Sequence, residues 1–189
     1  MREYIKRSLM ESYNLSASVY DQLYGEEQEA KYVEGLRMTP PVNDLVVLDA
    51  GCGSGLLLEK LSGLTSLAVG IDFSEKMIKI ARSKIKLENV AFVIGDIENM
   101  PFKNDTFNTV FMFTVINNTP KPLQALSEAW RILKGGGYLV VSFLKKTFTE
   151  DEAEMLLNAS RFEIINRSCE KTNDYVYICL KKPFYFTPQ

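Results

Sequence analysis

The chain has 189 residues, of which 46% are hydrophobic and 24% are charged, and its formal net charge is −2. This length suits one domain with a sizeable core, and the charge excludes a broad attraction to nucleic acid or anionic membranes. The chain has no histidine, which excludes an imidazole base and a histidine-ligated metal, so we expect no metal site. Three cysteines without CxxC spacing favour the cytoplasm, and no apolar run is long enough for a membrane span or signal peptide.

Hydrophobic periodicity and turn residues divide the chain into alternating helices and strands. Ser74 is the expected N-cap of the helix that follows it, and Gly135–Gly137 form an expected turn. The elements predicted in chain order are a helix Tyr20–Leu36 with a break near Gly25, a strand Leu45–Asp49, a helix Gly55–Leu61, a strand Leu67–Ile71, a helix after Ser74, strands Val90–Ile94 and Phe107–Phe113, a helix Leu123–Leu133, a strand Tyr138–Phe143, a helix Glu150–Ala159, and strands Phe162–Ser168 and Tyr175–Lys181.

This order of elements predicts a three-layer α/β fold. Helices between strands require crossover connections, so the seven strands should form a mainly parallel sheet covered by helices on both faces. The last two strands have no helix between them and should form an antiparallel hairpin. In such a sheet, ligands bind beyond the carboxyl ends of the strands, where the strand order reverses. Residues 51–55, 72–73, 96–97 and 114–118 follow the first four strands and should therefore converge on one cleft.

The stretch VLDAGCGSG (Val47–Gly55) carries the first ligand-binding pattern. Its glycines do not follow the GxGxxG spacing of a dinucleotide fingerprint, because Leu56 stands where the third glycine would be. Asp49, just before the glycines, would repel a pyrophosphate but attract an ammonium or sulfonium group. Asp72 is placed to accept hydrogen bonds from ribose hydroxyls, but dehydrogenases share this feature, so it does not discriminate. Asp96 is more informative, because it can accept a hydrogen bond from an adenine amine.

These motifs together resemble the class I S-adenosylmethionine-dependent methyltransferases. VLDAGCGSG resembles the first motif, GIDFSEKMIKIAR (Gly70–Arg82) the ribose-binding strand and helix, VIGDIENMPFKNDTFNTVF (Val93–Phe111) the adenine loop, and EAWRILKGGGYLVVSF (Glu128–Phe143) the helix, turn and fifth strand. The resemblance spans about residues 42–143 and is greatest with the branch that includes quinone-biosynthesis and small-molecule enzymes. It implies a Rossmann-like methyltransferase fold over residues 1–189, with a helical segment (residues 1–41) bordering the active site and a cofactor-binding core (residues 42–189).

The resemblance also assigns roles by position. The implied cofactor is S-adenosylmethionine, with S-adenosylhomocysteine as the product. Each residue has a structural alternative: the glycines can simply form a turn, Asp72 can cap a helix, Asp96 can form a turn, and Phe73 and Met77 can be ordinary packing. The implied cofactor-binding residues are Asp49, Gly51, Cys52 and Gly53 at the methionine portion, Asp72 at the ribose, Phe73, Met77, Asp96 and Ile97 at the adenine, and Thr114 near the methyl group.

The acceptor side departs from the family. Asn117 and Asn118 stand where relatives often carry histidines; they can orient an acceptor, or they can belong to a turn in which Thr119 caps the next helix. Tyr13 and Tyr20 are further acceptor-side candidates, with core packing as the alternative. The catalytic base is left unassigned.

The predicted function is methyl transfer to a small molecule. The alternatives are methyl transfer to RNA or protein with a partner subunit, a cofactor-binding protein without catalysis, and a nicotinamide oxidoreductase. For the assembly, a partner subunit and a homodimer are both left open.

Overall fold

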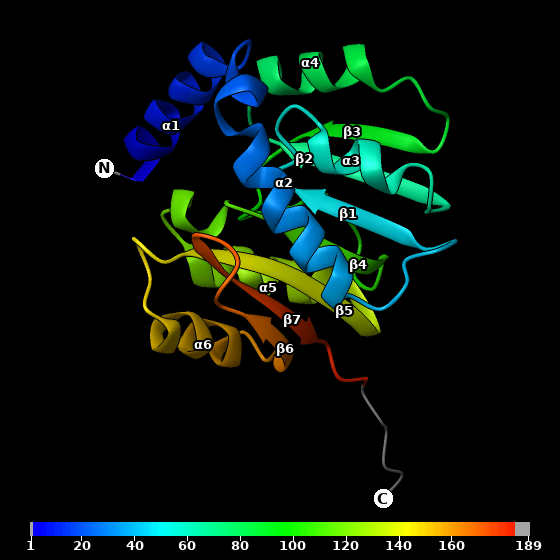
Figure 1. Cartoon of the computed structure of the whole chain (residues 1–189), viewed down its shortest axis with the longest axis vertical. Coiled ribbons are helices and arrows are strands. Elements are labelled where there is room, and N and C mark those ends of the chain that lie inside the picture. Colours follow the sequence, from blue (N-terminus) through cyan, green and yellow to red (C-terminus); the bar gives the residue numbers. More distant parts are fainter. Residues whose placement is uncertain (1, 184–189) are drawn as a thin grey trace, which may run out of the picture.

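The computed structural model describes residues 2–183, with side chains described from residue 6 onward. A seven-stranded sheet forms the centre of the molecule, and helices cover it (Figure 1). The helices are α1 (Arg2–Ser16), α2 (Tyr20–Met38), α3 (Leu56–Leu61), α4 (Glu75–Lys84), the short 3-10 helix η1 (Ile116–Asn118), α5 (Pro122–Ile132) and α6 (Glu150–Ala159). The strands are β1 (Val46–Ala50), β2 (Leu67–Asp72), β3 (Val90–Ile94), β4 (Phe107–Met112), β5 (Leu133–Leu144), β6 (Glu163–Ser168) and β7 (Asp174–Leu180).

The strand order is β3-β2-β1-β4-β5-β7-β6. Strands β1 to β5 pair in parallel, while β7 runs antiparallel between β5 and β6. The predicted parallel sheet and its antiparallel hairpin are therefore confirmed. The order reverses between β1 and β4, and this is the point at which an open α/β sheet binds its ligands.

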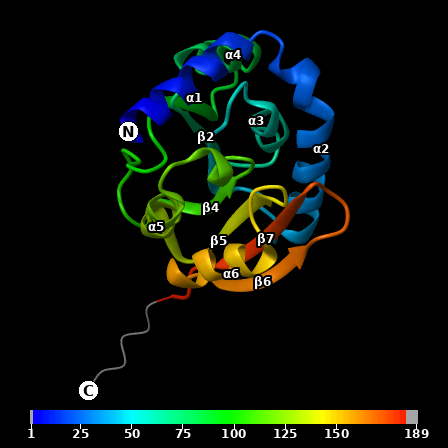
Figure 2. The same ribbon diagram turned by 90° about the vertical axis from the view of Figure 1, so that its left-hand side faces the viewer.

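Strand β1 shows how the core forms on both faces of the sheet. Val47 and Leu48 are adjacent and fully buried, but they belong to different core clusters because successive side chains point to opposite faces. Val47 packs in the cluster that includes Leu57 of α3, and Leu48 in the cluster that includes Leu126 of α5. The sheet thus lies between α2, α3 and α4 on one side and α5 and α6 on the other (Figure 2). This is the expected three-layer arrangement.

The N-terminal segment differs in detail from the prediction. Helix α1 precedes the first predicted helix and lies beside α4 (Figures 1 and 2). Helix α2 runs through Gly25 without the expected break. A Cβ at Gly25 would meet nothing within 4 Å, so this glycine lowers helix propensity by about 1 kcal/mol relative to alanine without interrupting the helix.

The predicted turn at Gly135–Gly137 is wrong, because these residues lie within β5. The register between β4 and β5 shifts there: Phe107 pairs with Leu133, whereas Thr109 pairs with Tyr138. Gly136 has φ of 82° and its N–H donates to the Lys181 carbonyl at 2.8 Å. The glycines therefore form an irregularity in a long strand. At this irregularity β5 stays hydrogen-bonded to the segment after β7.

None of the helices within residues 2–183 is both long and apolar enough to cross a membrane.

Candidate active site

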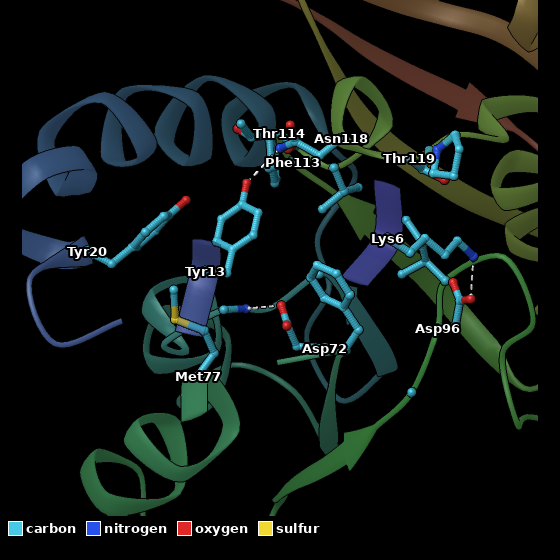
Figure 3. A pocket seen from close by; sticks show the side chains of 17 residues that line it. Lys6, Tyr13, Tyr20, Asp72, Met77, Asp96, Phe113, Thr114, Asn118 and Thr119 are labelled. Atoms are coloured by element: carbon cyan, nitrogen blue, oxygen red, sulfur yellow. Dashed lines mark hydrogen bonds and ion pairs between the residues drawn. The ribbon is translucent and has the colours of Figure 1, made fainter. Parts of the chain in front are cut away.

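The carboxyl ends of the first four strands converge on one cavity, as predicted (Figure 3). The strand ends and the N-terminal helices supply its walls. The cavity is lined by Lys6, Tyr13, Tyr20, Gly51, Gly53, Asp72, Phe73, Met77, Gly95, Asp96, Ile97, Phe113, Thr114, Val115, Asn118, Thr119 and Pro120. Among the predicted residues, Asp49, Cys52 and Asn117 lie outside this lining.

The turn after β1 requires its glycines. Gly51, Gly53 and Gly55 all have positive φ, of 84°, 51° and 87°. A Cβ at Gly51 would lie 2.0 Å from Cγ1 of Val115, which leaves no space for a side chain. A Cβ at Gly53 would meet nothing within 4 Å and would instead occupy the cavity. Gly51 is therefore required by packing against the chain, and Gly53 leaves room for a ligand.

Asp72 joins this turn to the second strand. Its Oδ2 accepts from the Gly53 N–H at 3.0 Å and its Oδ1 accepts from the Ser74 N–H at 2.8 Å. Burial raises the pKa of Asp72 despite these bonds, which oppose the shift. Ser74 caps α4 as predicted, because its hydroxyl accepts from the Met77 N–H at 3.2 Å. Each Asp72 oxygen retains a lone pair for hydroxyl donors of a ligand.

Asp49 is a second buried acid, at the end of β1. Its side chain is nearly inaccessible, and burial, with the nearby Asp72 carboxylate, raises its pKa to about 8. No lysine or arginine of the described residues pairs with it. A cationic ligand would supply the missing positive charge. Cys52, in the same turn, packs its buried thiol into the core and offers only its backbone to a ligand.

Asp96 follows β3 and faces α1. Its Oδ2 lies 2.5 Å from the Lys6 ammonium, which is also 2.5 Å from Glu98, and its Oδ1 accepts from the Glu98 N–H at 2.9 Å (Figure 3). Burial opposes the charge of Lys6, but its bonds to Asp96 and Glu98 raise its pKa. Lys6 was missed by sequence reasoning, since nothing near it in the chain indicates where α1 lies.

Aromatic side chains close the cavity from the N-terminal side. The Tyr13 ring lies 6.0 Å from those of both Phe73 and Tyr20, between centroids. Figure 3 shows Tyr13 reaching from α1 across the cavity to Asn118, whose Nδ2 donates to the Tyr13 hydroxyl at 2.7 Å. The structure thus brings Tyr13, Tyr20 and Asn118 together, but not Asn117, whose buried Oδ1 has no hydrogen-bond partner within the described chain.

The structural alternative in which Thr119 caps the helix after β4 is wrong. Helix α5 begins at Pro122, and its N-cap is Lys121, which makes no side-chain capping bond. The Thr119 hydroxyl instead bonds to the Glu98 carboxylate. Thr119 therefore anchors the loop to the turn after β3 and does not cap a helix.

Thr114 stands at the end of β4 in a strained conformation, with φ of 59°. Its N–H donates to the Ser142 hydroxyl at 2.9 Å, and Ser142 donates to Asp174 at 2.7 Å. From α2, the Lys31 ammonium donates to the Thr114 hydroxyl at 3.1 Å. Contacts from β5 and α2 therefore hold Thr114 in the left-handed region, as such strain requires, and Asp174 of β7 fixes the Ser142 hydroxyl.

Lys31 itself is fully buried, and sequence reasoning missed it. Its ammonium lies 2.8 Å from Glu27 and 3.2 Å from Asp174, which is also fully buried. In the sequence, Glu27 and Lys31 have the spacing of an ordinary solvent-exposed helical ion pair. Only the packing of α2 against β7 shows that this lysine is internal.

The described residues hold no cluster of acidic or cysteine side chains that could bind a metal ion.

Comparison with known proteins supports a methyltransferase assignment. Residues 48–141 match a methyltransferase domain family. The demethylmenaquinone methyltransferase of Lactococcus lactis subsp. lactis is 31% identical over 142 residues, which cover 70% of this chain and 56% of that protein. The enzyme of that name from Staphylococcus aureus strain MRSA252 is 40% identical over 97 residues, or 49% of this chain and 40% of the relative. The chain belongs to the class I S-adenosylmethionine-dependent methyltransferases.

Solved structures of methyltransferases share the fold. A chain from the complex between the Haloferax volcanii Trm112 methyltransferase activator and a methyltransferase has a TM-score of 0.84 at 16% identity, over 94% of this chain and 99% of that one. A Thermotoga maritima methyltransferase has a TM-score of 0.76 at 21% identity, over 92% and 100%. The chain thus has the Rossmann-like fold expected from its motifs. Its relatives place it in the branch that includes quinone-biosynthesis enzymes, and the family assignment replaces the nicotinamide alternative. The chain spans about half the length of the demethylmenaquinone relatives it matches.

Proposed function

We propose that this protein transfers the methyl group of S-adenosylmethionine to a small-molecule acceptor. The observation that carries the proposal is the pair of buried carboxyls, Asp49 and Asp72, at adjacent strand ends around a turn whose Gly53 leaves the cavity open. A ligand with a positive charge and vicinal hydroxyls would satisfy both acids. A dinucleotide pyrophosphate would bring negative charge to the same place.

The residues fit the cofactor in three groups. Asp72 would hold the ribose hydroxyls, while Asp96 and the Ile97 backbone would bind the adenine edge between Phe73 and Met77. Asp49, Gly51, Gly53 and the Cys52 backbone would hold the methionine portion, with Thr114 near the methyl group. Residues 42–189 would then form the cofactor-binding core, and residues 1–41 would border the active site.

When bound, the cofactor would supply an electrophilic methyl group on a sulfonium, to which an acceptor lone pair would bond while the carbon–sulfur electron pair stays with sulfur. The protein's main task is therefore alignment, which can contribute about 7–11 kcal/mol. The rings of Tyr13, Tyr20 and Phe73 exclude water from a step in which positive charge disappears. Asn118 would orient the acceptor through the Tyr13 hydroxyl.

A small acceptor is supported by the names of the relatives, which act on demethylmenaquinone. The alternative is a protein or RNA acceptor with a partner subunit. The partner subunit is supported by the structural neighbour that is bound to a methyltransferase activator. A cytoplasmic location is part of the same proposal and is supported by three free thiols.

The first test is calorimetric titration with S-adenosylmethionine, S-adenosylhomocysteine and NAD. We expect the first two to bind and NAD to fail. Asp72→Asn retains an oxygen acceptor for the backbone but loses the negative charge. It should lower the affinity for S-adenosylmethionine at least about tenfold, or 1.4 kcal/mol. Glu75→Gln, at an exposed acid in the next helix, should bind as the unchanged protein does. Equal affinity of Asp72→Asn would contradict the ribose assignment.

The second test identifies the acceptor class. Labelled S-adenosylmethionine and the protein are added to a cell extract that is then separated into metabolites, RNA and protein. Label in the metabolites is expected. Label in RNA or protein would favour the alternative acceptor, and cofactor binding without any label transfer would favour a non-catalytic protein.

A further inference from the structure

A second cavity, of about 720 Å³, adjoins the cofactor cavity. The two share Tyr13, Tyr20, Thr114 and Asn118, so they meet where the methyl group of the cofactor would lie. The rest of the second cavity comes from α1, from α2, from the segment after β5 and from the turn before β7. Its size suits a small molecule. The inference drawn from it rests on the proposed methyltransferase function.

One wall of the second cavity is a row of tyrosines. The Tyr20 ring lies 6.0 Å from Tyr13 and 5.0 Å from Tyr24, between centroids, with interplanar angles of 49° and 47°. Contacts of aromatic rings at such separations contribute about 0.5–1.5 kcal/mol each beyond their buried area. A continuous aromatic wall therefore favours a planar ligand that adds its own ring to the row.

The second cavity contains no group suited to remove a proton from its ligand near neutral pH, among the described residues that line it. Burial raises the pKa of Tyr13 to about 12 and the pKa of Tyr20 well above its usual value, so both hydroxyls stay protonated. Glu27, the acid in the lining, is paired with the Lys31 ammonium at 2.8 Å. A neutral alcohol would have to lose its proton without help. An acceptor that is already ionised becomes neutral on methylation and has no proton to lose.

The charges that face the second cavity are mainly positive. Lys145 and Lys146 lie on the segment after β5 and line it. The Lys145 ammonium donates to the carbonyls of Cys169 and Thr172. Lys146 is exposed and makes no side-chain hydrogen bond or ion pair within residues 6–183. Lys31 lies between two carboxylates, those of Glu27 and Asp174, so this cluster keeps one negative charge against the two positive charges of Lys145 and Lys146. The balance at the cavity is therefore positive, and Lys146 is the lysine available to a ligand.

We infer that the second cavity binds the methyl acceptor and that this acceptor is a planar, anionic molecule. The tyrosine row packs against its ring, the hydroxyls of Tyr13 and Tyr20 donate to its nucleophilic side, and Lys146 pairs with its acidic group. A cationic amine is disfavoured, because it has no lone pair until it loses a proton and because it would face two lysines and the sulfonium.

Four probes that share a carbon skeleton test this inference. 2-Naphthoate, 2-naphthalenemethanol, 2-naphthylmethylamine and decahydro-2-naphthoate are titrated calorimetrically into protein saturated with S-adenosylhomocysteine. The naphthoate should bind about fivefold more tightly than the alcohol, which corresponds to one partly exposed ion pair, and more tightly than the amine and the saturated acid. Equal binding of acid and alcohol, or tighter binding of the amine, would overturn the anionic class. Equal binding of the saturated acid would overturn the planar class.

Variants locate the binding. Lys146→Gln should reduce the preference for naphthoate over the alcohol to within about twofold, whereas Lys182→Gln, at a lysine paired with Glu163 near the far end of β7, should leave it unchanged. Tyr24→Ala should lower the affinity for naphthoate but not the affinity for S-adenosylhomocysteine, because Tyr24 lines only the second cavity. A preference retained in Lys146→Gln would overturn the role of that lysine. Failure of S-adenosylhomocysteine itself to bind would contradict the proposed function instead, so the two failures are distinguishable.

Discussion

At the scale of single residues, the buried acid Asp49 couples stability and ligand binding to pH. Because its folded pKa of about 8 exceeds the ordinary value of 3.8, the folded protein retains a proton that the unfolded chain loses between these pH values. The contribution of Asp49 to the free energy of unfolding therefore falls as the pH rises from about 4 to 8, by about 1.4 kcal/mol for each pH unit in that interval. A cationic ligand reverses this preference, since it favours the ionised carboxyl.

Asp49→Asn should separate these two effects. We expect the variant to be more stable than the unchanged protein at pH 9 by at least about 1.4 kcal/mol, with little difference near pH 4. Its affinity for S-adenosylmethionine should be lower and should lose the rise between pH 6 and 9. Denaturant unfolding and calorimetry across this range measure both, with the exposed Glu88→Gln as control. A variant destabilised at pH 9 would show that Asp49 is not an unpaired buried acid.

Lys31 supplies a second prediction at this scale. Lys31→Met removes the ammonium beside the buried Asp174 carboxylate. It should lower the free energy of unfolding by about 3–5 kcal/mol, because it leaves a buried charge unpaired. Lys31→Met with Asp174→Asn should recover part of this loss. The ion pair of Lys60 with Glu29 is partly exposed, so Lys60→Met should cost less than about 1 kcal/mol. Equal losses in denaturant unfolding would contradict a special role for Lys31.

At the scale of elements, the turn after β1 separates packing from binding. Gly51→Ala places a Cβ 2.0 Å from Val115 and should destabilise the fold by more than about 2 kcal/mol, with partial recovery in Gly51→Ala with Val115→Ala. In Gly53→Ala the new Cβ meets no atom, so the free energy of unfolding should fall only by the penalty for a left-handed backbone at a residue other than glycine, about 1–2 kcal/mol. The variant should nevertheless abolish S-adenosylmethionine binding. Retained binding in folded Gly53→Ala would contradict the placement of the ligand over this turn.

Helix α1 is held to the core largely by polar side chains. Lys6 pairs with Asp96 and Glu98, the Ser74 hydroxyl donates to Asn14 at 2.7 Å, and Tyr13 accepts from Asn118. Lys6→Ala should accelerate amide hydrogen exchange within residues 2–16 by about fivefold, equivalent to 1 kcal/mol. Exchange in β1 and β4 should not change. Arg7→Ala, whose ion pair with Glu11 is exposed, is the control, and equal acceleration by both variants would exclude an anchoring role for Lys6.

At the scale of the whole molecule, cofactor binding should stabilise every element together, because the site joins the ends of four strands. At about 100 times its dissociation constant, S-adenosylhomocysteine should add about 2.7 kcal/mol. That corresponds to a rise in Tm of roughly 5–11 °C for a chain of this size. Thermal unfolding measures it, with NAD as the control ligand. A rise with NAD but not with S-adenosylhomocysteine would contradict the proposed cofactor.

The sequence by itself determined the fold and the convergence of the first four strand ends on one cavity. Strand and helix periodicity, with acids placed at or just after the ends of β1, β2 and β3, is local information, and the carboxyl ends of parallel strands must meet at one edge. Tertiary structure alone decided the rest. Lys6 and Lys31 reach their partners across 90 and 83 residues of chain, and Gly51 is fixed by Val115 from another strand end. The second cavity likewise exists only because α1 and α2 pack over the sheet edge, where no local pattern specifies the neighbours.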